Sequence, residues 1–130
     1  MEVNMKLDYE CLRSVALEIE DNVSPISSIT NQEINDQQLF SEFPTEQVYL
    51  CIQYLIDNKC IKGSIENYLT GLPFICIHNM TEQGYNFCNA VRDNSIWGKI
   101  KSALFKTSTP SITDIIDTAT GIIGIIKQKP

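Results

Sequence analysis

Apolar positions recur at helical spacing along much of the chain. Between about Lys6 and Glu20 they fall three and four residues apart, which predicts an amphipathic helix. The same spacing runs from Glu46 to Asn58, where Thr45 is the expected N-cap. A short helix from about Asp36 to Ser41 is expected before it. Two helices joined by such a tight turn predict a helix-turn-helix pair.

Two runs rich in β-branched and aromatic residues follow, Cys60 to Ile65 and Phe74 to Met80. A glycine and a proline lie between them and suit a turn, so the two runs predict a β-hairpin. A hairpin directly after a helix-turn-helix pair is the wing of a winged helix. Residues 25–34 keep no clear period, and we expect there a short extended piece near Ser27 to Thr30.

The segment after the hairpin predicts another helix. Thr81 is its expected N-cap, and the helix should end near Val91 with Tyr85 and Cys88 facing inward. Gly84 lies in its first turn, although glycine inside a helix costs about 1 kcal/mol relative to alanine. Two explanations stay open for this glycine: a close approach of another backbone, or a helix start that tolerates it by chance.

A further helix is expected from Ser95 to Phe105, with Trp97 in its buried stripe. Asp93 or Asn94 should cap it. Arg92 suits the negative end of the preceding helix dipole. The Arg-Asp step and the tryptophan are therefore interpreted as structural residues.

The last predicted helix runs from Ile112 to about Lys127 and carries isoleucine on nearly every side. Ser111 with Asp114 resembles a capping box at its start. A helix that is apolar all round must be buried by its own domain, by a second copy or by a membrane surface. It is too short to span a bilayer, and its acidic residues argue against a membrane-bound helix. We expect packing or a homodimer, with these candidate contacts: Ile115, Ile122, Ile123 and Ile126.

Together these elements predict an α+β fold. A winged helix-turn-helix domain, residues 1–91, would be followed by a C-terminal helical extension, residues 92–130, that packs on it or forms a dimer contact. A chain of 130 residues suits this compact arrangement.

Residues that could carry chemistry are scattered. The chain has five cysteines and one histidine, His78, with no Cys-x-x-Cys spacing, whereas a zinc site needs about four clustered ligands. We expect free thiols in a reducing compartment, no metal and no cofactor. No phosphate loop or nucleophile-base motif is visible, so we expect no enzyme. No stretch reads as a signal peptide or a membrane span, which favours a cytoplasmic protein with no membrane partner.

One longer motif covers residues 81–101, T-x-x-G-x-x-F-x-x-A-x-R-D-x-x-x-W-x-x-I-K. Its defined positions are Thr81, Gly84, Phe87, Ala90, Arg92, Asp93, Trp97, Ile100 and Lys101. The chain resembles the prophage family called domain of unknown function 2513. It is similar, more distantly, to the YjcQ-like winged-helix proteins of Gram-positive bacteria and their phages. The resemblance covers residues 6 to about 126; it implies a winged-helix fold and a phage or prophage setting, but no activity and no catalytic residues.

The charge is unevenly spread, which bears on the partner. Residues 1–58 carry two basic and eleven acidic residues, a net of −9, whereas residues 59–106 carry six basic and three acidic residues, a net of +3. The helix that would enter a DNA major groove contains no arginine or lysine. Gln47 and Gln53 suit base contacts, but the acidic residues would repel phosphates. We expect a protein partner more than DNA, with these candidate contacts: Glu46, Tyr49, Gln53, Tyr54 and Asp57.

Two other functions stay open. Lysines of the wing and of the helix after Asp93 would form a basic patch for DNA if they converge, although a solvated helix face is the alternative. These candidates are Lys59, Lys62, Lys99, Lys101 and Lys106. The acidic half would instead suit a phage-encoded inhibitor of a host nucleic-acid-binding or defence protein. The sequence thus favours a phage-type winged-helix interaction protein.

Overall fold

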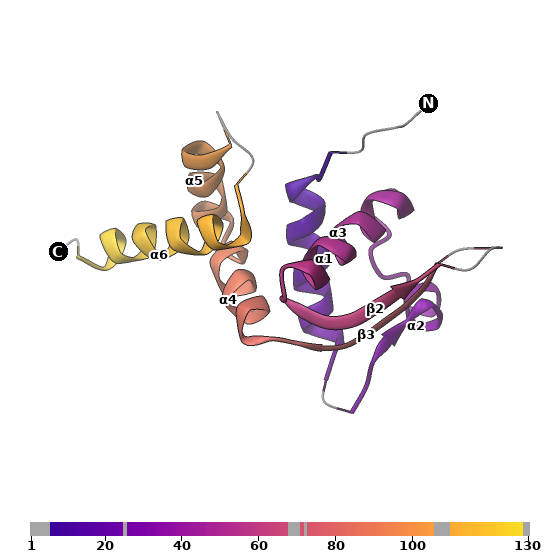
Figure 1. The fold of residues 1–130 in the computed structure, drawn as a ribbon. Coiled ribbons are helices and arrows are strands. Elements are labelled where there is room, and N and C mark those ends of the chain that lie inside the picture. The colour runs from indigo at the N-terminus through magenta and orange to yellow at the C-terminus, as the bar shows by residue number, and fades with distance from the viewer. Residues whose placement is uncertain (1–5, 25, 68–70, 72, 106–109, 129–130) are drawn as a thin grey trace. The chain divides into compact units, whose positions relative to one another are not determined.

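The computed structural model describes residues 6–24, 26–67, 71, 73–105 and 110–128, with side chains to residue 125 (Figure 1). The fold is α+β, as predicted. Within the described ranges the elements are α1 (Tyr9–Asn22), β1 (Ile29–Thr30), α2 (Asn31–Asp36), α3 (Thr45–Asp57), β2 (Ile61–Glu66), β3 (Phe74–Met80), α4 (Glu82–Val91), α5 (Asn94–Leu104) and α6 (Ile112–Gln128). They form two compact units, Met1–Gly84 and Tyr85–Pro130, so that α4 begins in the first and continues into the second. The predicted division at residue 91 stays a prediction.

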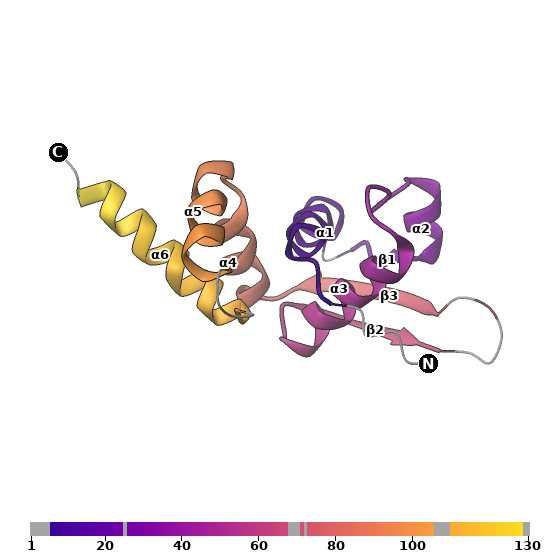
Figure 2. The same cartoon turned by 90° about the horizontal axis from the view of Figure 1, so that it is seen from above.

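The first unit has a winged-helix-like arrangement. Its strands form an antiparallel sheet in the order β1-β3-β2, so the hairpin predicted from the sequence is present and gains a short third strand. Ile75 and Ile77 of β3 are fully buried on one face of this sheet. Helices α1 and α3 cover that face, and both views show them on the same side of β2 and β3 (Figures 1 and 2).

Helices α1 and α3 pack along the apolar stripes that the sequence predicts. Leu12 and Val15 of α1 and Ile52 and Leu55 of α3 are fully buried. Helix α1 begins at Tyr9, three residues later than predicted, because the Asp8 carboxylate caps it, accepting the N–H groups of residues 10 and 11 at 2.9 and 3.3 Å. Local periodicity therefore identified the buried faces, and the cap set the boundary.

The predicted helix from Asp36 to Ser41 is wrong. The short helix α2 lies earlier because Thr30 and Glu33 form a capping box at its start: Thr30 accepts a backbone N–H, and the Glu33 carboxylate accepts the Thr30 N–H at 2.9 Å. After α2 the chain turns, and Gln38 and Phe40 have φ angles of 52° and 61°. This left-handed backbone cannot continue a helix.

The predicted cap of α3 is also wrong. Pro44 occupies the N-cap position, Thr45 is the first helical residue, and among the described residues no side chain caps this helix start. The fixed φ of proline suits a position at a helix entry, which explains the shift of one residue.

Gly84 is explained by a close backbone approach. Thr81 caps α4 as predicted, since its Oγ1 accepts the Gly84 N–H at 3.1 Å and donates to the Lys59 carbonyl oxygen at 2.5 Å. A Cβ on Gly84 would overlap the carbonyl oxygen of Cys60. Of the two explanations for the glycine, the close approach is the one that the structure supports.

The second unit contains the predicted caps and aromatic anchor. Asp93 caps α5 by accepting the Ile96 N–H at 3.0 Å. Trp97 is 3% exposed, and Phe105 meets its ring edge-on with centroids 5.7 Å apart. Tyr85, predicted to face inward, is 43% exposed, so that prediction is wrong.

Helix α6 starts with the predicted capping box. Ser111 Oγ accepts the Asp114 N–H, and the Asp114 carboxylate accepts the Ser111 N–H, each at 3.1 Å. In the part of the chain that is described, no helix is long and apolar enough to cross a membrane.

Candidate functional site

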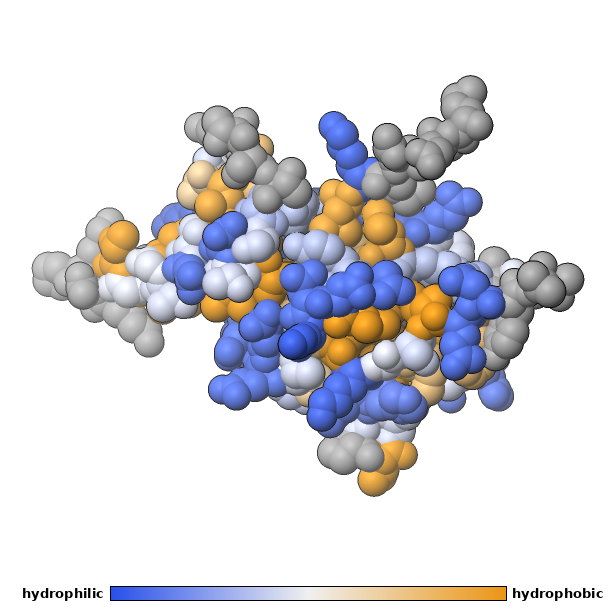
Figure 3. All heavy atoms as spheres, in the orientation of Figure 1, coloured by the Kyte–Doolittle hydropathy of each residue, from blue (hydrophilic) through white to orange (hydrophobic). Residues whose placement is uncertain are grey.

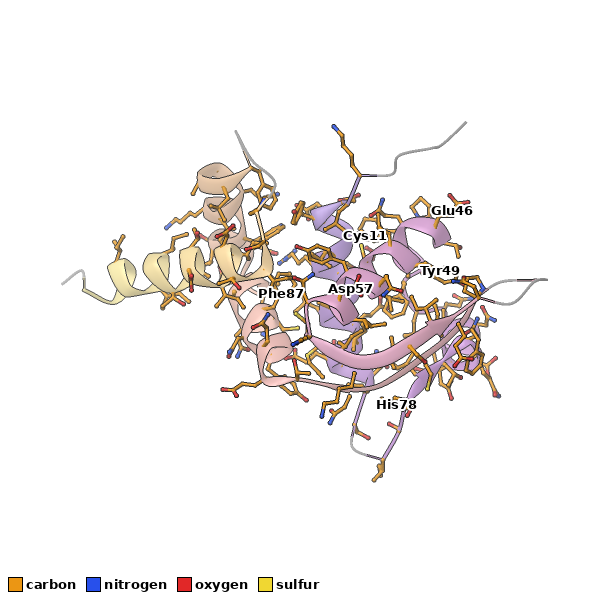
Figure 4. The ribbon with its side chains drawn as sticks, viewed as in Figure 1. Cys11, Glu46, Tyr49, Asp57, His78 and Phe87 are labelled. Carbon is orange, nitrogen blue, oxygen red and sulfur yellow. The ribbon has the colours of Figure 1, made fainter. Side chains whose placement is uncertain are left out.

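The exposed side of α3 carries acids and aromatic residues. Glu46 at its start and Asp57 at its end are exposed, and Tyr49 between them is half-buried (Figure 4). Gln53 donates its side-chain N–H to the Asp57 carboxylate at 2.8 Å. The helix has no basic residue, so its surface presents negative charge and aromatic area.

Gln47 is not available to read bases, which corrects the sequence-based interpretation. Its Oε1 accepts the Asp8 N–H at 3.0 Å, and its Nε2 donates to the Lys6 carbonyl oxygen at 3.1 Å. The side chain thus holds the segment before α1 against α3 and satisfies its amide locally.

Tyr54 lies on the side of α3 that meets α1, and it is half-buried. Burial raises the pKa of Tyr9 to about 12, and the neighbouring Tyr54 adds to the shift. Tyr54 therefore forms part of the contact between the helices more than part of an open face.

An acidic hollow of about 420 Å³ lies beside α1 in the first unit. Its lining residues are Glu10, Arg13, Ser14, Leu17, Glu18, Asp21, Ser41, Glu42 and Phe43. Glu18 accepts the Phe40 N–H at 3.0 Å. Burial raises the pKa of the Glu18 carboxyl, the hydrogen bond from Phe40 opposes the shift, and Glu42 and Asp21 add to it. Glu18 thus ties α1 to the turn before α3.

A smaller apolar hollow of about 120 Å³ lies on the other side of this turn. Its lining residues are Ile34, Asn35, Leu39, Phe40, Thr45, Val48 and Tyr49. Both hollows include residues of the segment 39–45, so this segment links the acidic recess beside α1 to the apolar recess beside α3. Figure 3 shows hydrophobic patches bordered by hydrophilic residues on the side of the first unit that faces the viewer. Neither hollow was predicted. The α1 residues and the turn residues that line the acidic hollow are about twenty or more positions apart in sequence. The charge of −9 over residues 1–58 was the one sequence feature consistent with it.

The chain belongs to the family described as "Hypothetical protein (DUF2513)". The match covers residues 6–110, which includes all of the first unit's described helices and strands. The predicted family is confirmed, whereas the relation to YjcQ-like proteins and the phage setting stay predictions. No curated protein and no solved structure matches the chain. The family description states no activity, so function is inferred from the charge and shape of the protein surface.

The candidate DNA-binding lysines are divided between the two units. Lys59 and Lys62 lie beside and on β2, and Lys99 and Lys101 lie on α5; all four are exposed. Lys106 lies outside the described residues. Residues two apart on a helix face different directions, and the Lys101 ammonium lies 5.8 Å from the Trp97 ring centre. Lys99 and Lys101 therefore do not form a joint patch by themselves.

The candidate dimer contacts on α6 differ in exposure. Ile115 is fully buried, Ile122 and Ile123 are half-buried, and the side chain of Ile126 lies outside the described set. A groove of about 310 Å³ runs between α4 and α6 within the second unit. Its lining residues are Asn86, Asn89, Ala90, Ile116, Ala119, Thr120 and Ile123. Ile122 and Ile123 are the candidates that retain surface for a partner.

All five cysteines are free. Over the described ranges, no group of three or more His, Cys, Asp or Glu residues is placed to hold a metal ion. Cys11 and Cys51 are buried neighbours on α1 and α3, and burial raises the pKa of both thiols. These two thiols belong to the core.

Proposed function

We propose that this protein is a protein-binding module of a phage or prophage. Its first unit would hold a basic protein segment against the acidic face of α3 and the two hollows beside residues 39–45. An aromatic or aliphatic side chain of the partner would enter the apolar hollow, and a lysine or arginine would enter the acidic hollow. The free thiols also favour a cytoplasmic setting.

One observation supports this proposal above all. The helix in the position of a recognition helix has no basic residue, and its two glutamines bind within the first unit. DNA affinity depends on neutralising phosphates and on free donors for base edges. A surface of Glu46, Asp57 and Tyr49 meets neither need, but it complements a positively charged protein.

The same surface suits a nucleic-acid-binding protein as the partner. Such proteins present basic grooves for phosphates, and spaced carboxylates can occupy them in place of phosphate groups. An inhibitor of a host nucleic-acid-binding or defence protein is therefore the more specific form of this function.

The proposal is tested by charge reversal. The double variant Glu46→Lys/Asp57→Lys should lose partners that the wild-type protein captures from host lysate at low salt, measured by quantitative mass spectrometry. The control Glu66→Lys/Asp117→Lys has the same net charge with α3 intact and should keep them. Partner identity is then checked by titration of the purified partner, whose affinity should fall with rising salt.

The competing DNA function has its own measurement. Fluorescence anisotropy with a random-sequence duplex at about 50 mM salt should show no binding by the wild-type protein. Binding that is lost in Lys59→Gln/Lys62→Gln or Lys99→Gln/Lys101→Gln would replace the proposed function with DNA binding. An unchanged set of captured partners in the α3 double variant would also reject the proposal.

A further inference from the structure

A cluster of three reactive or polar side chains lies on the face of the sheet opposite α1 and α3. The Cys76 thiol lies 3.6 Å from Nε2 and 3.7 Å from Nδ1 of His78. The Ser28 hydroxyl lies 3.5 Å from Nδ1 of the same ring. A nucleophile, a base and a group that orients the base are thus adjacent, although Ser28 is fifty residues from His78 in sequence. Figure 4 shows where His78 lies on the sheet.

An irregularity in the sheet lies at this cluster. Lys62 pairs with Asn79 and Gly63 pairs with Ile77, so His78 has no direct partner on β2. A bulge of this kind changes the direction of a side chain, and bulges are frequent next to functional sites. Gly63 permits it, since a Cβ there would overlap the Cys76 carbonyl oxygen.

Cys76 differs from the other four cysteines in exposure. It is half-buried, whereas Cys11, Cys51, Cys60 and Cys88 are fully buried. Burial also raises the pKa of the Cys60 thiol to about 11, which keeps it protonated at neutral pH. A thiol that is both protonated and inaccessible is inert, so reagents in solution should reach Cys76 first.

We propose that Cys76 is a peroxide-reactive thiol whose proton is taken by His78. Nδ1–H of the ring donates to the Ser28 hydroxyl, which leaves Nε2 free to accept the thiol proton. The sulfur attacks one oxygen of hydrogen peroxide, so that an S–O bond forms and the O–O bond breaks. The sulfur loses two electrons and becomes a sulfenic acid, while the departing hydroxide takes the proton from His78 and leaves as water.

The surroundings of the cluster contribute hydroxyl groups and a few charged residues. Thr30 on β1 and Ser64 on β2 are the register partners of Cys76 and carry hydroxyl groups. The charged residues on the neighbouring elements are Lys62 and Glu66 on β2 and Glu33 and Asp36 on α2. The Glu33 carboxylate is bound to Thr30. His78 is thus the titratable group in contact with the thiol among the described residues.

The test is a labelling rate measured at single sites in the intact chain. Iodoacetamide, or hydrogen peroxide followed by dimedone, should modify Cys76 about tenfold faster than the four buried cysteines in the folded protein, as mapped by peptide mass spectrometry. His78→Asn should slow labelling of Cys76 about three- to tenfold near pH 7 and change its pH profile. Ser28→Ala should also slow the labelling of Cys76, by a smaller factor than His78→Asn does.

Two controls keep the result interpretable. Lys62→Gln removes a neighbouring charge without changing the thiol or His78. The labelling rate of Cys76 in this variant should stay within about twofold of the wild-type rate. His78→Gln repeats the main variant with another neutral side chain, and circular dichroism confirms that both are folded. Equal rates in wild-type and both His78 variants would overturn the proposal. A Cys76 rate no faster than that of free N-acetylcysteine would overturn it too.

Discussion

At the scale of single residues, a few contacts decide which side chains matter. Gly84 allows the first turn of α4 to lie against the carbonyl oxygen of Cys60. Glu18 holds the Phe40 N–H at a turn whose backbone is in the left-handed region. Non-glycine residues there cost about 1–3 kcal/mol, so such contacts must hold them in place.

Gly84→Ala should destabilise the protein by about 1–3 kcal/mol, because the added methyl group overlaps the Cys60 carbonyl oxygen. Gly98→Ala is a matched control, since nothing lies near its Cβ position on α5. It should be neutral or stabilising by up to about 1 kcal/mol. Urea unfolding followed by circular dichroism measures both, and equal effects would contradict the close-contact explanation.

Glu18 should give the stability a defined pH dependence. Its pKa is raised by burial, so the folded state holds the proton more tightly than the unfolded chain. Its contribution to stability is full below the unfolded pKa of about 4.3 and is lost as pH rises through the folded pKa. Glu18→Gln does not titrate and keeps an oxygen for Phe40. The variant should therefore gain stability relative to wild type as pH rises above about 4.3, measured by urea unfolding.

At the scale of elements, caps decided boundaries where periodicity did not. The apolar stripes of α1, α3 and α5 were predicted correctly because burial follows a local spacing. The short helix α2 was misplaced because it has no fully buried residue and therefore no stripe to detect. Its signal was Thr30 followed three residues later by Glu33, a pattern that specifies a helix start by hydrogen bonding alone.

Thr30→Ala should destabilise the protein by about 0.5–2 kcal/mol, because α2 loses its capping hydroxyl. Thr30→Ser keeps the hydroxyl and should recover most of that loss. Thermal unfolding of both variants distinguishes the stability that comes from the capping hydroxyl from the stability that comes from packing of the Thr30 methyl group in β1. The two variants behaving alike would mean that the methyl group, not the cap, stabilises this region.

At the scale of the whole molecule, the open question is what the apolar half of α6 contacts. Its outward glycines, Gly121 and Gly124, have nothing near their Cβ positions, and Ile125 is 60% exposed. The groove between α4 and α6 carries no charged side chain among its lining residues. A second copy could approach there without the repulsion expected of a chain with net charge −6.

A homodimer through Ile122 and Ile123 is expected to form at high protein concentration. Sedimentation velocity should show concentration-dependent association that Ile123→Asp weakens at least about tenfold, equal to about 1.4 kcal/mol. Gly121→Asp adds the same charge on a different side of the helix, where nothing lies near the Cβ position, and should leave association unchanged. A monomer at every concentration would reject the dimer without affecting the proposed function of α3.

The sequence by itself determined what depends on neighbouring residues: the helical stripes, the hairpin, the caps at Thr81 and Ser111, and the family. It narrowed the cap of α5 to Asp93 or Asn94, and the structure shows Asp93. The sequence also placed the acidic charge in the first half of the chain. Tertiary structure alone decided the sites. It engaged Gln47 with residues about forty positions away, joined α1 to the turn before α3 to make the acidic hollow, and brought Ser28 to His78. Periodicity reports how one segment is buried, whereas a site depends on which distant segments the shared core brings together.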